Sequence, residues 1–211
     1  MKIGIIGGTF DPIHYAHLLL AESARETLGL DRVIFIPAAI PPHKQTRRIT
    51  DGRLRAAMIR AAVAGIPEYD VSTFEIDSGG VSYTVETLRY LRGRFPGDRL
   101  ILIVGSDTLC DIPNWYKPRE ICRLASIAAA RRPDSAPVDY SPLAPLTSPA
   151  RLARMSKMVV PMPLFEISST EIRRRVAAGG SVRFLTPEKV VRLIRKHGLY
   201  LSDGDCRRKG V

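Results

Sequence analysis

Short apolar runs alternate with helical stretches over roughly the first 130 residues, and this alternation limits the fold more than any other feature of the sequence. Such a rhythm is typical of a parallel sheet whose strands are joined by crossover helices. The expected strands are residues 2–6, 32–37, 71–74 and 100–104, and the expected later helices are residues 52–64, 84–92, 118–124, 169–178 and 187–197. We therefore predict an α/β fold with a doubly wound parallel sheet and a small C-terminal helical region.

A chain of 211 residues with 45% hydrophobic and 25% charged residues is long enough to bury one sizeable core, which excludes a largely disordered or collagen-like protein. We expect a single domain over residues 1–211. Five prolines fall within residues 133–149, so residues 133–150 are expected to form a mobile, exposed loop. The polar residues 202–211 are expected to form a frayed tail.

The N-terminal segment indicates a cytoplasmic protein. Residues 1–6 form too short an apolar run for a signal peptide and no cleavage site follows, and no apolar run is long enough to span a membrane. The three cysteines, Cys110, Cys122 and Cys206, contain no C-x-x-C pair, so we expect reduced thiols and no zinc clip.

The net charge of +11 is uneven, because residues 1–150 contribute 18 basic and 16 acidic side chains and residues 151–211 contribute 14 and 5. A basic last third suits a nucleic acid, a phosphorylated small molecule or a solvated face, and charge alone does not choose among them. A nucleic-acid-binding protein is the weaker alternative, since the sequence has no aromatic RNA-binding strand motif, zinc pattern or basic heptad helix.

The segment Gly7–Pro12 follows the first strand and is followed by His14 and His17. Its two glycines allow close backbone approach, and loops at the carboxyl ends of parallel strands bind anions. We expect Asp11 to cap the next helix, which ends at Gly29 and carries both histidines on one face. Exposed or capping histidines, or a zinc site completed by His43 or a distant carboxylate, are the alternatives.

A second helix start lies at Ser168, where Ser-Ser-Thr-Glu forms a capping box with Glu171, and Arg173 follows one turn later. The free N–H groups and the guanidinium suit an anion, although such a start is often purely structural. Between the two motifs, Tyr83 and Thr84 precede a helix, Gly105 and Asp107 follow a strand, and Trp115 is the lone tryptophan. Each of these has an ordinary structural role as its alternative.

These segments resemble the two signatures of the HxGH nucleotidyltransferase superfamily: Gly7–Pro12 with H-x-A-H at residues 14–17, and I-S-S-T-E-I-R at residues 167–173. Ala16 stands where the family usually has glycine. The set S-Y-T, G-S-D and Trp115 is similar to the bacterial nicotinate-mononucleotide adenylyltransferase branch rather than the pantetheine-phosphate branch. The resemblance covers residues 1–201 except the proline-rich segment at residues 133–149, and the basic tail also lies outside it.

The resemblance implies a Rossmann-like fold and adenylyl transfer from ATP to nicotinate mononucleotide with Mg²⁺, by direct in-line attack, yielding nicotinate adenine dinucleotide and pyrophosphate in NAD biosynthesis. Another adenylyl or cytidylyl transfer is the nearer alternative, and acceptance of nicotinamide mononucleotide stays open. No nucleic-acid, membrane or protein-bound metal partner is expected, and a homo-oligomer is allowed. The residues implied as catalytic are His14, His17 and Arg173; as ATP-binding, Gly7, Gly8, Thr9, Phe10, His14, His17, Gly105, Asp107, Arg132, Ile167, Ser168, Ser169 and Arg173; and as mononucleotide-binding, Thr9, Phe10, Lys44, Tyr83, Thr84 and Trp115.

Overall fold

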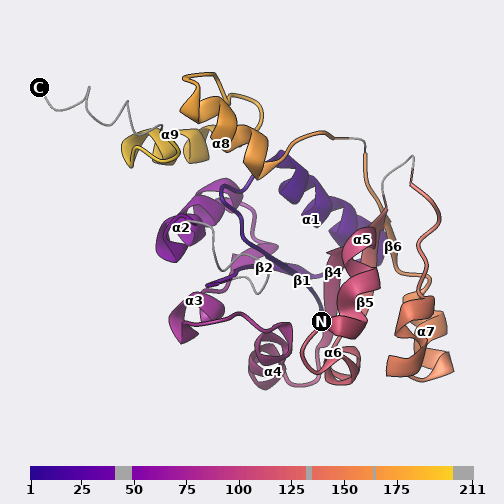
Figure 1. Cartoon of the computed structure of the whole chain (residues 1–211). Helices are drawn as coiled ribbons and strands as arrows, with labels where there is room; N and C mark the ends of the chain where they lie inside the picture. The colour runs from indigo at the N-terminus through magenta and orange to yellow at the C-terminus, as the bar shows by residue number, and fades with distance from the viewer. Residues whose placement is uncertain (41–48, 132–134, 164, 202–211) are drawn as a thin grey trace, which may run out of the picture.

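The computed structural model describes residues 1–40, 49–131, 135–163 and 165–201. Over these residues, six parallel strands form one sheet in the order β3-β2-β1-β4-β5-β6 (Figure 1). This is the strand order of a doubly wound Rossmann sheet, so the predicted fold class is confirmed. The strands are β1 (Lys2–Gly8), β2 (Arg32–Pro37), β3 (Tyr69–Val71), β4 (Arg99–Gly105), β5 (Ser126–Arg131) and β6 (Val159–Pro161).

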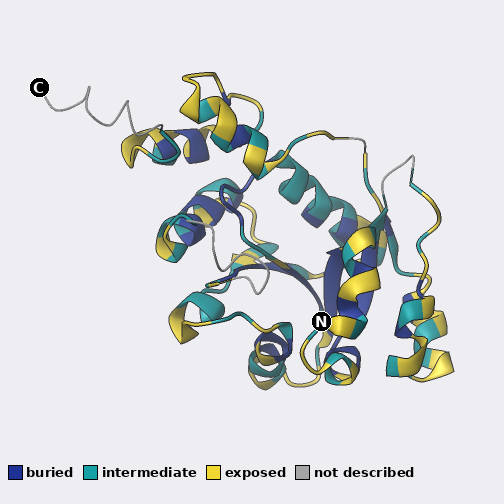
Figure 2. Ribbon diagram, in the orientation of Figure 1, coloured by how far each residue is buried: buried dark blue, intermediate teal, exposed yellow. Residues whose placement is uncertain are grey.

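Helices cover both faces of the sheet, because successive strand residues point to opposite sides. On β1, Ile3 and Ile5 pack on the face covered by α4 (Thr84–Arg94), α6 (Pro118–Leu124) and the 3-10 helix η2 (Ser141–Leu146). Ile6 packs on the other face with α1 (Tyr15–Leu28), α2 (Gly52–Val63) and α9 (Glu188–Lys196). Figure 2 shows the resulting pattern, with buried strands between helices that expose only their outer sides. The remaining helices are α3 (Phe74–Ser78), α5 (Ser106–Asp111), η1 (Ile112–Asn114), α7 (Pro149–Met155) and α8 (Ser169–Ala177).

The first helix begins later than the sequence predicts. Its N-cap is His14, and Asp11 lies in a turn with its side chain 5% exposed. The Asp11 carboxylate accepts hydrogen bonds from the Tyr200 hydroxyl at 2.6 Å and the Thr50 N–H at 3.4 Å. The prediction that Asp11 caps the helix is wrong because this carboxylate has distant partners. Gly29 ends the helix as expected, with a left-handed φ of 59°.

The expected strand at residues 71–74 is also misplaced. β3 ends at Val71, and Phe74 begins α3, where its ring stacks on Tyr90 of α4 with centroids 4.2 Å apart. β3 is an edge strand and pairs only with β2 in the described sheet, so few backbone partners are present to extend it past Val71. The sequence pattern predicts neither strand β5 nor strand β6.

The proline-rich segment is not the long exposed loop that its composition predicts. Leu143 in η2 is fully buried, and Tyr140 is 5% exposed. The Tyr140 hydroxyl accepts from the Ala129 N–H at 3.0 Å and donates to the Met158 carbonyl at 2.9 Å, which ties the segment to β5. Two large side chains packed on the core are enough to hold this chain, so the expectation of an exposed loop is wrong for residues 140–146.

The predicted C-terminal helical region consists of α8 and α9, which lie together at the top of Figure 1. Ile172, Val182 and Val191 form a small core of their own, while Val190 and Ile194 join α9 to the core beneath α2. No helix in the described part of the chain is long and apolar enough to cross a membrane. The single-domain organisation stays a prediction, and the expected frayed tail at 202–211 lies outside the described residues.

Candidate functional site

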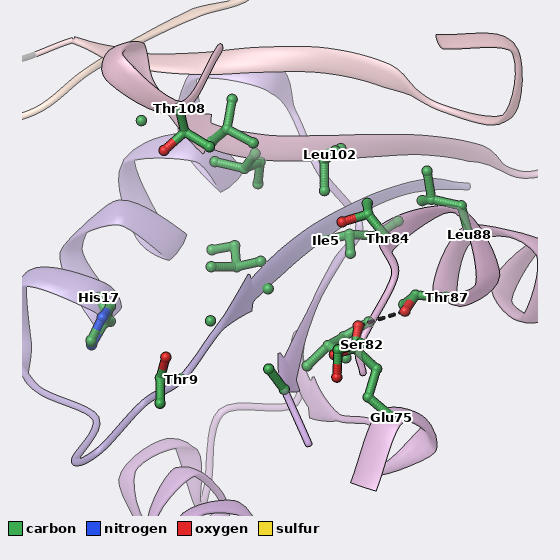
Figure 3. Close-up of a pocket in the computed structure, with 18 of the residues that line it drawn as sticks. Ile5, Thr9, His17, Glu75, Ser82, Thr84, Thr87, Leu88, Leu102 and Thr108 are labelled. Atoms are coloured by element: carbon green, nitrogen blue, oxygen red, sulfur yellow. Dashed lines mark hydrogen bonds between the residues drawn. The ribbon is translucent and has the colours of Figure 1, made fainter. Parts of the chain in front are cut away.

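A cavity of about 310 Å³ opens at the carboxyl ends of β1 and β4 (Figure 3). From β1 the strand order runs through β2 to one edge of the sheet, and from β4 it runs through β5 to the other edge. The cavity therefore lies at the topological switch point, where doubly wound folds bind ligands. Gly7 and Gly8 of β1, Thr9, and Gly105 of β4 line it together with His17. The predicted first motif therefore forms the floor of a cavity.

The backbone of the first motif is shaped by a buried phenylalanine. Phe10 is 2% exposed and has a positive φ of 48°, and its ring packs on Phe35 and edge-on against His17 at 4.9 Å. A Cβ atom at Gly8 would lie 3.1 Å from this ring, so glycine is what allows the ring to fit under the turn. The Phe10 side chain supports the turn from below, which leaves only its backbone to face a ligand.

His14 and His17 stack on each other at the start of α1, with ring centroids 3.7 Å apart. The backbone N–H of His14 donates to Nδ1 of His17 at 3.3 Å. Because Nδ1 accepts this bond, the proton of the neutral His17 ring sits on Nε2. His17 thus brings a single N–H donor to the cavity that it lines.

Burial keeps both imidazoles neutral. Desolvation lowers the pKa of His14 to about 4, and the pKa of His17 falls well below 6.5 through desolvation and the repulsion that a protonated His14 would exert. Nδ1 of His14 is buried and finds no hydrogen-bond partner among the described residues. Two neutral rings, one with an unused polar atom, are suited to hydrogen-bonding an anion rather than to permanent ion pairing.

The second motif docks directly on the first. Ser168 caps α8 by accepting from the Glu171 N–H at 3.2 Å, which confirms half of the predicted capping box, while the Glu171 carboxylate bonds Arg174 and Arg175. Ser169 Oγ donates to the Pro12 carbonyl at 2.9 Å. The start of α8 therefore lies against the turn that carries the histidines.

Arg173 strengthens this contact, because its guanidinium donates to the Asp11 carbonyl at 2.6 Å and to the Thr170 hydroxyl at 3.1 Å. Thr186 donates to the Ile13 carbonyl at 2.7 Å from the segment before α9. These hydrogen bonds join residues more than 150 positions apart in the sequence, although Ser169 and Arg173 are not among the residues that line the cavity.

A buried arginine supports the same turn from the other side. Arg55 of α2 is 1% exposed and donates to the carbonyls of Thr9, Ala38 and Thr50 at 2.7, 2.7 and 2.8 Å. Burial lowers the pKa of this guanidinium, and the charge of Asp11 opposes that shift. Arg55 joins the ends of β1 and β2 beneath the cavity and adds positive charge where an anion would bind.

The far wall of the cavity comes from α3, α4 and Trp115. Thr84 and Trp115 line it, as the middle motifs predict, and a second cavity of about 210 Å³ continues from them past Tyr83. Tyr83 is 42% exposed, and its ring lies 4.9 Å from that of Tyr116. Aromatic rings beside hydroxyl donors suit a planar, polar ligand.

The structure does not bring every predicted residue to the cavity. Asp107 is exposed in the first turn of α5, and Ser168 is exposed at the start of α8. Ile167 is half-buried against the small core of α8 and α9. Lys44 and Arg132 lie outside the described residues.

Several residues at the site were missed by sequence reasoning. Glu75 on α3 lines the cavity, and its carboxylate accepts from the Thr87 hydroxyl at 2.5 Å (Figure 3). Desolvation raises the pKa of Glu75. Thr108 and Arg55 are also site residues that sequence reasoning missed. The sequence does not predict helix α3, which carries Glu75, and no local pattern distinguishes a buried helical arginine such as Arg55 from an exposed one.

Comparison with known proteins agrees with this geometry. The model of the cytidylyltransferase-like family matches residues 5–175. A protein of Thermomicrobium roseum described as a probable nicotinate-nucleotide adenylyltransferase is 41% identical over 94% of this chain and 91% of its own length. A protein of Roseiflexus sp. with the same description is 44% identical over 94% of this chain and 97% of its own.

Among solved structures, the Plasmodium falciparum nicotinic acid mononucleotide adenylyltransferase complexed with NaAD superposes with a TM-score of 0.70 at 17% identity, covering 94% of this chain and 97% of the other. At that identity the likeness supports the fold. Because the family match spans most of the sequence, this chain belongs to the cytidylyltransferase-like family and is a nucleotidyltransferase. Its relatives at about 40% identity make the assignment narrower: the chain belongs to the nicotinate-nucleotide adenylyltransferases.

Proposed function

We propose that this enzyme transfers the adenylyl group of ATP to nicotinate mononucleotide, releasing pyrophosphate and forming nicotinate adenine dinucleotide in the cytoplasm. The observation that carries the proposal is the joining of two anion-binding motifs at the switch point: Ser169 and Arg173 bond the carbonyls of Pro12 and Asp11 in the turn that presents His17. The names of the curated relatives support the choice of substrates.

The reaction requires the protein mainly to position the two substrates and to stabilise negative charge. The attacking phosphate oxygen is already anionic, so no general base and no covalent intermediate are needed. We assign the N–H donor of His17 and the ring of His14 to the α-phosphate, where negative charge spreads in the transition state. The start of α8 and Arg173 are assigned to the departing pyrophosphate.

Mg²⁺ is proposed to enter with ATP. The described residues contain no group of three or more His, Cys, Asp or Glu side chains able to hold a metal ion, so the donor set fits a cation carried by phosphate oxygens and water. When bound, it neutralises phosphate charge. Gly7, Gly8 and Gly105 leave backbone room for the nucleotide beside it.

The mononucleotide is placed at the other end of the cavity. Thr9, Tyr83 and Thr84 offer N–H and hydroxyl groups for its phosphate, and Trp115 offers a ring face for the pyridine. Lys44, Phe10 through its backbone, Asp107, Arg132, Ile167 and Ser168 remain proposed contacts from the resemblance alone.

The test is pyrophosphate release by the purified chain with ATP and Mg²⁺, run in parallel with nicotinate mononucleotide, nicotinamide mononucleotide and phosphopantetheine. We expect release with nicotinate mononucleotide to exceed the others by about tenfold or more, a transition-state difference of about 1.4 kcal/mol. Trp115→Ala should raise KM for the mononucleotide more than KM for ATP, while Phe184→Ala, at an 80% exposed ring, should change neither. Silence with all three acceptors would overturn the proposed acceptor.

A further inference from the structure

A second large cavity, of about 650 Å³, lies at the opposite end of the sheet from the catalytic cavity. Lys2, Arg99 and Ser126 line it, and they are the first residues of β1, β4 and β5. In Figure 1 the N-terminus marks this end of the sheet. Because β1 is seven residues long, about 20 Å of strand separates this cavity from the glycine-rich turn. It is therefore a different site from the one described above.

Positive charge dominates the lining. The only carboxylate among the lining residues is Asp98, and it already pairs with the N-terminal ammonium at 2.6 Å. Arg123 pairs with Glu120 at 3.3 Å, and no carboxylate in the described ranges lies within ion-pair distance of the other basic side chains. The six basic side chains that line this basic pocket are Lys2, Arg92, Arg99, Arg123, Arg151 and Arg154.

Three of these cations are held in place by main-chain carbonyls. Lys2 donates to Leu28 at 3.1 Å, Arg92 to Leu124 at 2.6 Å, and Arg151 to Ala125 at 3.0 Å. These carbonyls end α1 and α6, where cations are commonly found for structural reasons. The contacts account for three of the charges, and they also fix those three before any ligand arrives.

Helix capping does not account for the rest of the pocket. The side chains of Arg99 and Arg154 are exposed and make no hydrogen bond within the described residues, yet both line a pocket with four other basic side chains. Nε of Arg151 is buried without a partner in the same part of the chain. Burial lowers the pKa of Arg151; the neighbouring Cys122 opposes this shift, and the nearby charges of Arg154 and Arg92 add to it. A bound anion would provide a partner for the buried Nε of Arg151 and would offset the repulsion among the arginine charges.

We propose that the basic pocket binds a small ligand that carries two or more linked phosphate groups. Guanidinium groups bind phosphate oxygens two at a time, and several converge here. A volume of 650 Å³ is within the range of small-molecule sites and is too small to enclose a nucleic-acid helix. Leu28 and Met158 add an apolar wall. The site is independent of the proposed reaction, and its ligand need not be a substrate.

The test is an NMR titration of the ¹⁵N-labelled full chain with inorganic tripolyphosphate and, separately, with ATP. The reporters are the amide of Ser126 and the Nε–H of Arg151 for the basic pocket, and the amides of Gly8 and Gly105 for the catalytic cavity. We expect saturable shifts of the first pair with both probes. Equal affinities would mean that phosphates alone are bound, and tighter ATP binding would mean that the nucleoside adds contacts.

The variant is Arg99→Glu with Arg154→Glu, and the matched control is Arg60→Glu with Lys189→Glu. The control residues are exposed on α2 and α9, make no side-chain hydrogen bond within the described residues, and change the net charge equally. We expect the variant to weaken the response of the basic pocket by about tenfold or more and to leave Gly8 and Gly105 responding normally. Unchanged urea unfolding midpoints would confirm that both doubles are folded.

Three results would overturn the proposal. One is the absence of shifts at Ser126 and Arg151 with about 1 mM of either probe. The second is an equal loss of binding in the variant and its control, which would show that the loss comes from the change in net charge and not from the basic pocket. The third is tighter binding of a single-stranded or duplex RNA oligonucleotide at the same signals, which would make the pocket part of a nucleic-acid surface.

Discussion

Acidification should destabilise this protein through His14, and the size of the effect follows from its burial. Desolvation lowers the pKa of His14 to about 4, from an ordinary value of 6.5. The unfolded chain therefore takes up a proton between these two values that the folded chain refuses, so stability falls as pH drops through this window. At 1.36 kcal/mol for each unit of pKa, the loss from His14 is about 2 kcal/mol at about pH 5 and about 3 kcal/mol at about pH 4.

The assay compares urea unfolding of the natural chain and His14→Gln at a series of pH values. Glutamine does not titrate here, so the difference between the two free energies of unfolding isolates His14 together with its coupling to His17. We expect this difference to shift against the natural chain by about 2 kcal/mol between about pH 7 and pH 5. A difference that does not move with pH would refute the claim that the histidine pair is held neutral by burial.

Three further perturbations test other parts of the structure. His17→Ala should lower kcat by about tenfold or more with little loss of stability, because it removes the donor that we assign to the transition state; near-normal turnover would contradict that role. Leu143→Ala should cost about 2 to 5 kcal/mol of unfolding free energy, since the side chain is fully buried, whereas an exposed loop would lose almost nothing. Arg55→Met should cost about 3 kcal/mol because it leaves the carbonyls of Thr9, Ala38 and Thr50 without their donor; an unchanged thermal midpoint would show that they find other partners.

Local patterns predicted most of the secondary structure. The expected strand at residues 32–37 and helix at residues 118–124 match β2 and α6, and the other later helices agree to within two residues at each end. Gly29 and Ser168 ended and began their helices as expected. These features depend on apolar periodicity and on capping by neighbours in the sequence, and such information is present within any short window.

The errors arose where a distant contact overrode a local preference. Asp11 is a good helix cap by residue type, but its carboxylate bonds Tyr200, 189 positions away. The proline-rich segment has the composition of a loop, yet Tyr140 and Leu143 pack into the core. The edge strand β3 gave way to a helix at Phe74, whose ring stacks on Tyr90.

The sequence by itself determined the alternation of strands and helices, four of the strands, and the residue types of the two motifs that we assign to anions, because periodicity, glycine turns and caps are properties of adjacent residues. Only the tertiary structure decided that Ser169 meets Pro12 across 157 positions, that Glu75 and Arg55 belong to the site, and that the histidine pair is neutral. The same holds for the basic pocket, whose cations come from two strands and three helices. The distance between two groups and the desolvation of each depend on all the residues packed around them, which come from distant parts of the chain, so a short stretch of sequence does not determine them.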